Sequence, residues 1–355
     1  GCAIIGASQT IAPADRKLYA IRDVTATVES VPLVVSSILS KKLAAGAKGL
    51  VLDVKVGTGA FTASLREATT LATELVAVAN DAGLPTSAVL TDMNQVLGRC
   101  AGNSLEVAEA VEFLKGDASD ARLYEICLQL AIEGLLIGGV TADHRTARAM
   151  LEDALGNGRA LECFAEMVAM LGGPTDFCER IDRYLPRAPV IHEVRANVSG
   201  VVGALDVKAI GLLVVYLGGG RTQAADRVDH RVGLSDVRAP GAKVMKGERL
   251  ATVHAASEDA AAKVEERLRG AIEFSMRQDD AQSSPAQPVI VEKLRPGAGR
   301  GGARECGGEE THGRARARMS RKKNNSAGPT CSSGRNGCDT DATSPASEWK
   351  QAAAR

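Results

Sequence analysis

Leu-Val-Leu-Asp-Val-Lys-Val, at residues Leu50–Val56, gives the clearest indication of the fold class. Its apolar side chains follow one another almost without interruption, which is typical of a strand covered on both faces in a parallel sheet. Leu71, Leu75 and Val78 then recur at the spacing of one helix face, and residues 87–91 form a second short apolar run. This strand–helix–strand order predicts an α/β fold with a parallel sheet.

Helices dominate the next part of the chain. Asn103 with Glu106 three residues later resembles a capping box, and Gly116 fits the end of that helix. Three further helices are expected at residues 120–138, 142–155 and 159–171. From residue 189 onward, short Val-rich segments and glycine turns predict one helix at residues 258–272 and strands at residues 194–202, 212–217, 243–253 and 288–291.

These elements predict the domain organisation. We expect a parallel-sheet α/β domain with the remnant of a small helical domain, plus a C-terminal α+β domain. The tail that follows contains no Val, Ile, Leu, Phe or Tyr, so we expect it to be disordered. The expected boundaries are residues 1–15 for the end of an upstream α/β segment, 16–46 for a helical-domain segment, 47–188 for the α/β domain, 189–295 for the C-terminal domain and 296–355 for the tail.

The composition disfavours several classes of partner. The 355 residues contain 43 Lys plus Arg and 43 Asp plus Glu, and only 3% are aromatic, so neither nucleic acid nor a membrane is an expected partner. The eight cysteines contain no Cys-x-x-Cys pair, which is typical of free thiols in a reducing compartment, and we expect a cytoplasmic protein. The arginines of the tail leave open a nucleic-acid-binding arm, although a non-functional extension is the favoured interpretation.

A polar cluster is predicted on one helix near the start of the chain. Ser37 and Lys41 are spaced i and i+4 in the helical pattern of residues 31–43, so their side chains share one face. Arg22 precedes this helix and could fold back toward that face. A simpler interpretation stays open, because Lys41 and Lys42 in the last turn would also offset the helix macrodipole.

Three longer motifs lie between residues 18 and 61: Tyr-Ala-x-Arg-Asp-x-Thr-Ala-Thr-Val at 19–28, Ser-x-x-x-Lys-Lys-Leu at 37–43, and Asp-Val-Lys-x-Gly-x-Gly-Ala-Phe at 53–61. Together they strongly resemble the thymidine phosphorylases and the wider pyrimidine-nucleoside phosphorylase family. The resemblance continues to about residue 294 through residues 91–95, 102–107, 173–177 and 218–221. It implies a hammerhead-like shape for the C-terminal domain.

This resemblance implies reversible phosphorolysis, in which phosphate attacks the anomeric carbon of a pyrimidine nucleoside and releases a pentose 1-phosphate and the free base. It also implies that Arg22, Ser37 and Lys41 bind the base, with Arg22 and Lys41 as the catalytic cations that polarise its carbonyls. Such donors stabilise the charge that develops on the departing base. Members of the family need no cofactor, use inorganic phosphate as co-substrate and form homodimers. The motifs do not fix thymidine against uridine.

One family element has no match in the sequence. No stretch matches the glycine-rich phosphate loop of Lys-x-Ser-Thr-Gly-Gly-Val-Gly-Asp type, and none of the five histidines falls in a family motif. The chain also opens at Gly1 in an apolar run without Met. We therefore expect an N-terminally truncated chain that lacks most of the dimer-forming helical domain, has impaired activity and carries an unrelated tail.

Two other groups are weaker candidates for the site. Asp53 and Lys55 share one strand face near its carboxyl end, where they either line the site or pair with each other. Relatives that bind potassium imply ligands at the main-chain carbonyls of Leu97 and Cys100 and at the side chain of Glu109. A helical Glu is usually only solvated, so no metal site is expected.

Three alternatives stay open. A phosphoribosyltransferase of the same architecture would need clustered acidic residues to hold magnesium, and the polar segments contain no such pair. Lys246 lies in a turn that resembles the attachment hairpin of a lipoyl or biotin carrier. A truncated, non-catalytic homologue would retain only a partner-binding role.

Overall fold

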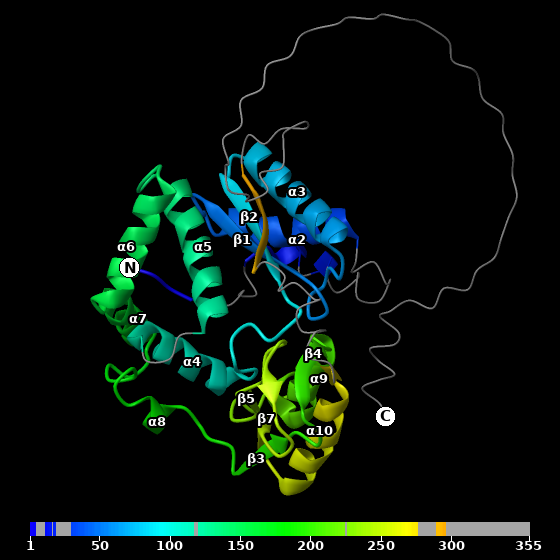
Figure 1. Cartoon of the computed structure of the whole chain (residues 1–355). Helices are drawn as coiled ribbons and strands as arrows, with labels where there is room; N and C mark the ends of the chain where they lie inside the picture. The colour runs from blue at the N-terminus through cyan, green and yellow to red at the C-terminus, as the bar shows by residue number, and fades with distance from the viewer. Residues whose placement is uncertain are drawn as a thin grey trace, which may run out of the picture. The chain divides into compact units, whose positions relative to one another are not determined.

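The computed structural model describes residues 1–4, 11–15, 17–18, 30–116, 120–223, 226–275 and 289–295 (Figure 1). The chain divides into a unit of residues 1–297, which is described below, and a unit of residues 298–355. Arg22 and the tail lie outside the described residues, so the expectations about them stay predictions. The expected domain boundaries also stay predictions.

The first sheet contains the apolar run of residues 50–56. β1 (Leu50–Val56) and β2 (Thr86–Asp92) pair in parallel along their whole lengths. Every residue of β2 is buried, because α3 (Leu65–Asp81) and α5 (Ala121–Ile137) both pack against these strands, from the two sides of the sheet in Figure 1. The predicted α/β fold with a parallel sheet is confirmed.

The last predicted strand forms, but in a different sheet. β9 (Ile290–Leu294) pairs antiparallel with β2, so the expectation that it belongs to the C-terminal strands is wrong. A buried carboxylate explains its position: Glu133 of α5 is 1% exposed and lies 2.8 Å from the Arg295 guanidinium and 3.6 Å from Lys293 Nζ. A buried charge requires paired partners, and this end of the chain supplies them.

Helix α2 (Val31–Ala44) packs against α3. Ser64 caps α3 in a full capping box, and the buried stripe of α3 runs through Leu71, Leu75 and Ala79, which are spaced i, i+4 and i+8. Val78 was expected on that face, but it is 43% exposed, because the stripe continues one position further along the helix.

The predicted helices after residue 103 are confirmed. They are α4 (Asn103–Lys115), α5, α6 (His144–Gly156) and α7 (Arg159–Met170), and the short α8 (Ile181–Tyr184) follows. The start of α4 differs from the expected capping box: Gly102 is the N-cap, and its N–H donates to Glu106 Oε1 at 3.1 Å. Gly102 has φ 146°, a conformation that favours glycine.

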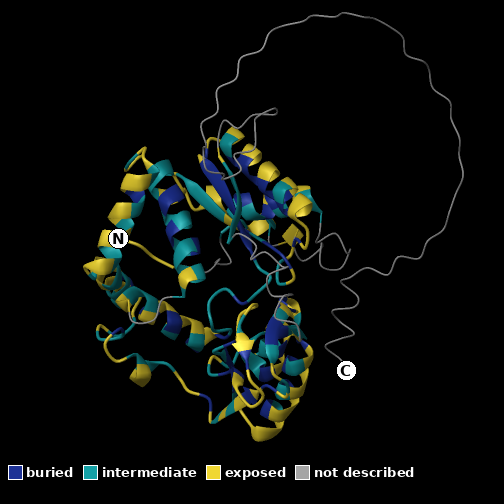
Figure 2. Ribbon diagram, viewed as in Figure 1, coloured by how far each residue is buried: buried dark blue, intermediate teal, exposed yellow. Residues whose placement is uncertain are grey.

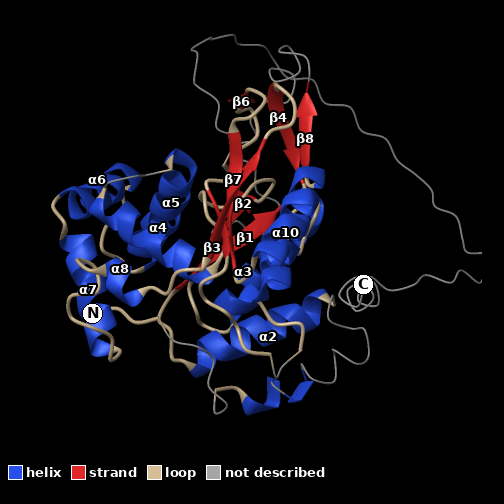
Figure 3. Ribbon diagram, turned by 90° about the horizontal axis from the view of Figure 1, so that it is seen from below, coloured by secondary structure: helices blue, strands red, loops and turns tan. Residues whose placement is uncertain are grey.

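The C-terminal part contains two antiparallel three-stranded sheets (Figure 3). One has the order β3 (Val190–Arg195), β7 (Arg249–Ala255), β5 (Gly233–Ser235), and the other has the order β6 (Lys243–Val244), β4 (Gly200–Leu205), β8 (Ile272–Ser275). Helix α10 (Glu258–Gly270) packs against β3 and β7. A large cluster of buried apolar residues fills this part, and Figure 2 colours the buried residues dark blue.

One predicted strand is a helix. Residues 212–217 lie in α9 (Val207–Val214) and the π-helical turn η1 (Val215–Gly219). The Val and Leu content favoured a strand, but the Asp206 side chain caps the helix by accepting from Ala209 N at 2.9 Å. Ile210, Leu213 and Leu217 are buried at helical spacing. None of the described helices combines the length and apolar character that crossing a membrane requires.

Candidate functional site

The structure brings Ser37 and Lys41 together on one face of α2. Pro32 fits the first turn of this helix, and Val35 and Leu39 anchor it in the core. Lys41 Nζ donates to Ser37 Oγ at 3.0 Å and to the Ser37 main-chain carbonyl at 2.8 Å. The predicted i, i+4 contact is therefore present.

Asp15 completes this cluster. Its carboxylate lies 2.6 Å from Lys41 Nζ, and the two side chains are 11% and 35% exposed respectively. An ammonium group has three N–H donors, and three acceptor atoms of the described residues surround this one. A further acceptor, such as a ligand carbonyl, would bind Lys41 by replacing one of them. Ser37 Oγ is the most distant of the three.

Asp53 and Lys55 form an ion pair with each other. Lys55 Nζ lies 2.7 Å from Asp53 Oδ2, and both side chains are 25% exposed. Thr91 of the neighbouring strand donates to Asp53 Oδ1 at 2.6 Å. Of the two expected roles, the structure shows the pairing, and a role in lining the site stays a prediction.

The glycine loop, residues 57–60, follows β1 directly. Its Thr58 N–H donates to Asn94 Oδ1 at 3.0 Å, and its Gly59 N–H donates to the Met93 carbonyl at 3.0 Å. Asn94 belongs to the family motif at residues 91–95, but its contact with the loop was not predicted. The available signal was a polar residue shortly after a buried strand, where ligands of open parallel sheets bind.

Two of the groups implied as potassium ligands have protein hydrogen-bond partners, and a potassium site here stays a prediction. The Leu97 carbonyl accepts from the Arg122 guanidinium at 3.0 Å, and Glu109 accepts from the main-chain N–H groups of Arg99 at 2.7 Å and Cys100 at 3.3 Å. Burial, with the Glu109 charge, raises the pKa of the Cys100 thiol to about 12. Elsewhere in the described residues, no group of three His, Cys, Asp or Glu side chains is placed to bind a metal.

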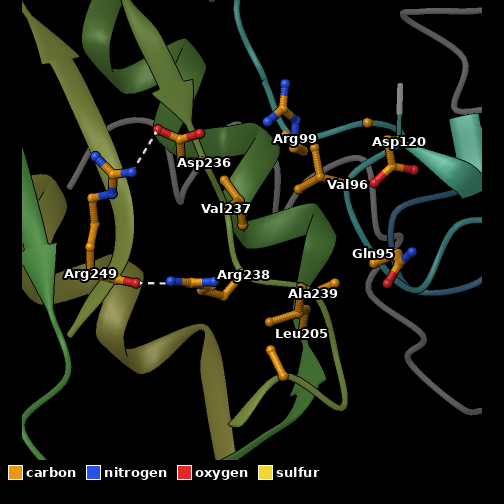
Figure 4. Close-up of a pocket in the computed structure, with 12 residues that line it drawn as sticks. Gln95, Val96, Arg99, Asp120, Leu205, Asp236, Val237, Arg238, Ala239 and Arg249 are labelled. Atoms are coloured by element: carbon orange, nitrogen blue, oxygen red, sulfur yellow. Dashed lines mark hydrogen bonds and ion pairs between the residues drawn. The ribbon is translucent and has the colours of Figure 1, made fainter. Parts of the chain in front are cut away.

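A cavity of about 330 Å³ lies between the 95–99 segment and the 236–242 segment (Figure 4). Its charged lining has protein partners: Arg249 lies 3.4 Å from Asp236 and accepts at its carbonyl from Arg238, and Arg99 lies 3.6 Å from Glu109. Neither Ser37 nor Lys41 lines it. It is therefore a different location from the predicted site.

Two histidines and the candidate attachment residue Lys246 have protein partners. His192 lies 2.6 Å from Glu265, and His254, whose pKa is lowered by burial, lies 2.8 Å from Ser235 Oγ. Lys246 lies between β6 and β7, and its main-chain N–H donates to Ser199 Oγ at 2.8 Å.

Comparison with known proteins first defines the class. Residues 1–161 match the family described as "Glycosyl transferase family, a/b domain", and residues 201–275 match the "Pyrimidine nucleoside phosphorylase C-terminal domain". The first match covers the α2 cluster (Asp15, Ser37 and Lys41) and the parallel strands, and the second covers most of the C-terminal sheets.

Curated relatives narrow this class. The thymidine phosphorylase of Rhizobium meliloti (strain 1021) is 48% identical over 298 residues, which are 84% of this chain and 66% of the relative. The thymidine phosphorylase of Burkholderia cenocepacia (strain HI2424) is 52% identical over 269 residues, which are 76% of this chain and 61% of the relative. The chain belongs to the pyrimidine-nucleoside phosphorylase family, and it spans about two thirds of the length of these relatives.

Proposed function

We propose that the chain acts in reversible phosphorolysis, transferring the pentose of thymidine or a related pyrimidine nucleoside to inorganic phosphate. The observation that carries this proposal is the Ser37–Lys41 contact on α2, in a chain about half identical to thymidine phosphorylases. The reaction needs no cofactor, and phosphate is a co-substrate.

The chemistry follows from charge. Breaking the bond between sugar and base leaves negative charge on the ring oxygens and nitrogens of the pyrimidine. Lys41, together with Arg22, would stabilise this charge at the base carbonyls, and removing one such donor typically costs about 3–4 kcal/mol of barrier. These two cations are the proposed catalytic residues.

The contacts of Lys41 suggest how the base enters. A pyrimidine carbonyl that replaces Ser37 Oγ at the ammonium would release the Ser37 hydroxyl to hydrogen-bond the ring edge. Asp15 and the Ser37 carbonyl would keep the other two ammonium N–H groups in place. Binding the base would then cost no loss of hydrogen bonds at Lys41.

We also propose that this 355-residue chain turns over slowly, because no part of it matches the phosphate loop of the family. We further propose that the chain forms a homodimer and is located in the cytoplasm. A homologue that binds the base without catalysis is the alternative.

Release of thymine from thymidine by the purified chain, with and without added phosphate, tests this function. We expect release that is slow but depends on phosphate, and chromatography of the free base measures it. If release is absent, calorimetry with thymidine decides between the alternatives: binding without turnover would support a non-catalytic homologue. Absence of both release and binding would overturn the proposal.

A further inference from the structure

The Arg122 guanidinium is a buried cation outside the proposed base site. It lies in the first turn of α5 and donates to the main-chain carbonyls of Val96 at 3.1 Å and Leu97 at 3.0 Å. It also contacts the Asp92 carbonyl and lies 3.3 Å from the Asp92 carboxylate. The side chains of both ion-pair partners are only 9% exposed.

These contacts fix the segment of residues 92–97 that follows β2. Burial lowers the pKa of Arg122 from its ordinary value, and the charge of Asp92 opposes that shift. A buried charge is tolerated when paired and fully hydrogen-bonded, and a planar guanidinium holds several acceptors in fixed directions. The segment therefore has little freedom to change its conformation.

Asp92, which Arg122 holds in place, in turn orients the side chain of Asn94. Asp92 Oδ1 accepts from the Asn94 main-chain N–H at 3.3 Å and from Asn94 Nδ2 at 2.5 Å. This pair of bonds orients the Asn94 amide so that its oxygen accepts from Thr58 N at 3.0 Å. Asn94 thus connects the segment fixed by Arg122 to the glycine loop.

The glycine loop fits closely against its neighbours. Gly57 has φ 132°, and a Cβ there would lie 2.7 Å from Asn94 Oδ1. A Cβ at Gly59 would lie 2.5 Å from Val207 Cγ1. The loop stands at the carboxyl end of β1, which is where ligands bind in open parallel sheets.

We propose that Arg122 is a positioning residue that holds the glycine loop, through Asp92 and Asn94, in the conformation that receives the nucleoside. This role rests on the proposed function. In this role Arg122 acts on the nucleoside only through the main chain of residues 57–60.

Amide hydrogen exchange of the full chain tests the positioning directly. Arg122→Met should speed exchange at Thr58 and Gly59 by about tenfold or more relative to the amides of β7, since local opening governs exchange in such loops. Arg122→Lys should give an intermediate rate, because an ammonium retains the charge but cannot hold all four acceptors. Equal acceleration in the loop and in β7 would show a global effect and overturn the proposal.

Two further variants sharpen the test. Asn94→Ala should reproduce the fast loop exchange, and combining it with Arg122→Met should add little, since residues in one network are not additive. Arg148→Met is the matched control, because Arg148 joins α5 to α6 at the surface through Glu125 and Glu152. It should leave loop exchange unchanged.

Calorimetry with thymidine separates this inference from the function on which it rests. We expect Arg122→Met to weaken thymidine binding about tenfold and Arg148→Met to leave it unchanged. Unchanged binding in Arg122→Met would overturn the role of Arg122 alone. Absence of binding by the unmodified chain would overturn the proposed function, and with it the nucleoside as the reason for this positioning.

Discussion

Two ion pairs in this chain differ in their surroundings. Lys41 pairs with Asp15, is 35% exposed and also contacts Ser37 one helical turn away. Arg122 pairs with Asp92, is 9% exposed and reaches across 30 residues of sequence. The first cation lies on one helix face, whereas the second joins a helix to the end of a strand.

This difference distinguishes a side chain that can bind a ligand from one that holds the protein's own conformation. A partly exposed ammonium can exchange one acceptor for another at little cost, because water and a ligand carbonyl offer similar hydrogen bonds. A buried guanidinium with four protein acceptors cannot do so without leaving a buried charge unpaired. We therefore expect substitutions of Lys41 to change chemistry and substitutions of Arg122 to change conformation.

The largest expected effect is on catalysis. Lys41→Ala should lower kcat/KM for thymidine phosphorolysis by about 100- to 1000-fold, because it removes a donor that stabilises the departing base. The melting temperature should fall only modestly. Thymine release measured beside Lys42→Ala, which changes the adjacent exposed lysine of α2, checks this. Turnover by Lys41→Ala within twofold of the unmodified chain would contradict the catalytic role of Lys41.

The next effect is on stability. Arg122→Met should lower the free energy of unfolding by about 3–5 kcal/mol, since it leaves the Asp92 carboxylate buried without its cation. Arg148→Met should lower it by less than about 1 kcal/mol, as expected for an exposed pair. Urea denaturation of both variants measures the contrast, and equal losses would contradict the distinction between the two settings.

A smaller effect is expected at Ser37. Ser37→Ala should weaken thymidine binding by about 1 kcal/mol, or roughly fivefold, because a single neutral hydrogen bond to the ring edge is lost. The fold should be unaffected, since Lys41 keeps its bonds to Asp15 and to the main-chain carbonyl of residue 37. Calorimetry at constant pH checks the value, and a loss as large as that of Lys41→Ala would contradict the assigned roles.

The smallest effect concerns alkaline pH. The Cys100 thiol has a pKa of about 12 in the folded chain against 9.0 ordinarily, so the protonated form is favoured by folding. Its contribution is complete below pH 9 and is lost as pH rises toward 12. Between pH 8 and 10 the unmodified chain should lose up to about 1 kcal/mol more stability than Cys100→Ala, after discounting for partial exposure. If the free energy of unfolding of the unmodified chain and of Cys100→Ala changed equally with pH, this prediction would be contradicted.

Local patterns made much of the fold predictable. The parallel pairing of Leu50–Val56, the helices that follow and the Ser37–Lys41 face all depend on neighbours within a few positions or on a continuous apolar run. The periodicity of apolar residues in the sequence indicates such features directly. They also carried the family resemblance.

Long-range contacts set the limit of that prediction. The Arg122–Asp92 pair and the pairing of β9 with β2 join residues far apart in sequence, so no spacing rule indicates them. The helix at Val207–Val214 was missed because its Val and Leu residues also suit a strand, and Asp206 settled the choice through a cap. Composition alone cannot decide between those two structures.

Calorimetry with thymidine tests whether Ser37, Lys41 and Asp15 form the base site, because binding does not depend on turnover. We predict that the unmodified chain and Lys42→Ala bind thymidine with dissociation constants within twofold of each other, whereas Lys41→Ala binds at least about tenfold more weakly, as expected for the loss of one hydrogen bond from a charged donor, worth about 1.5 kcal/mol. Equal binding by Lys41→Ala and the unmodified chain would contradict the assignment of the α2 cluster as the base site.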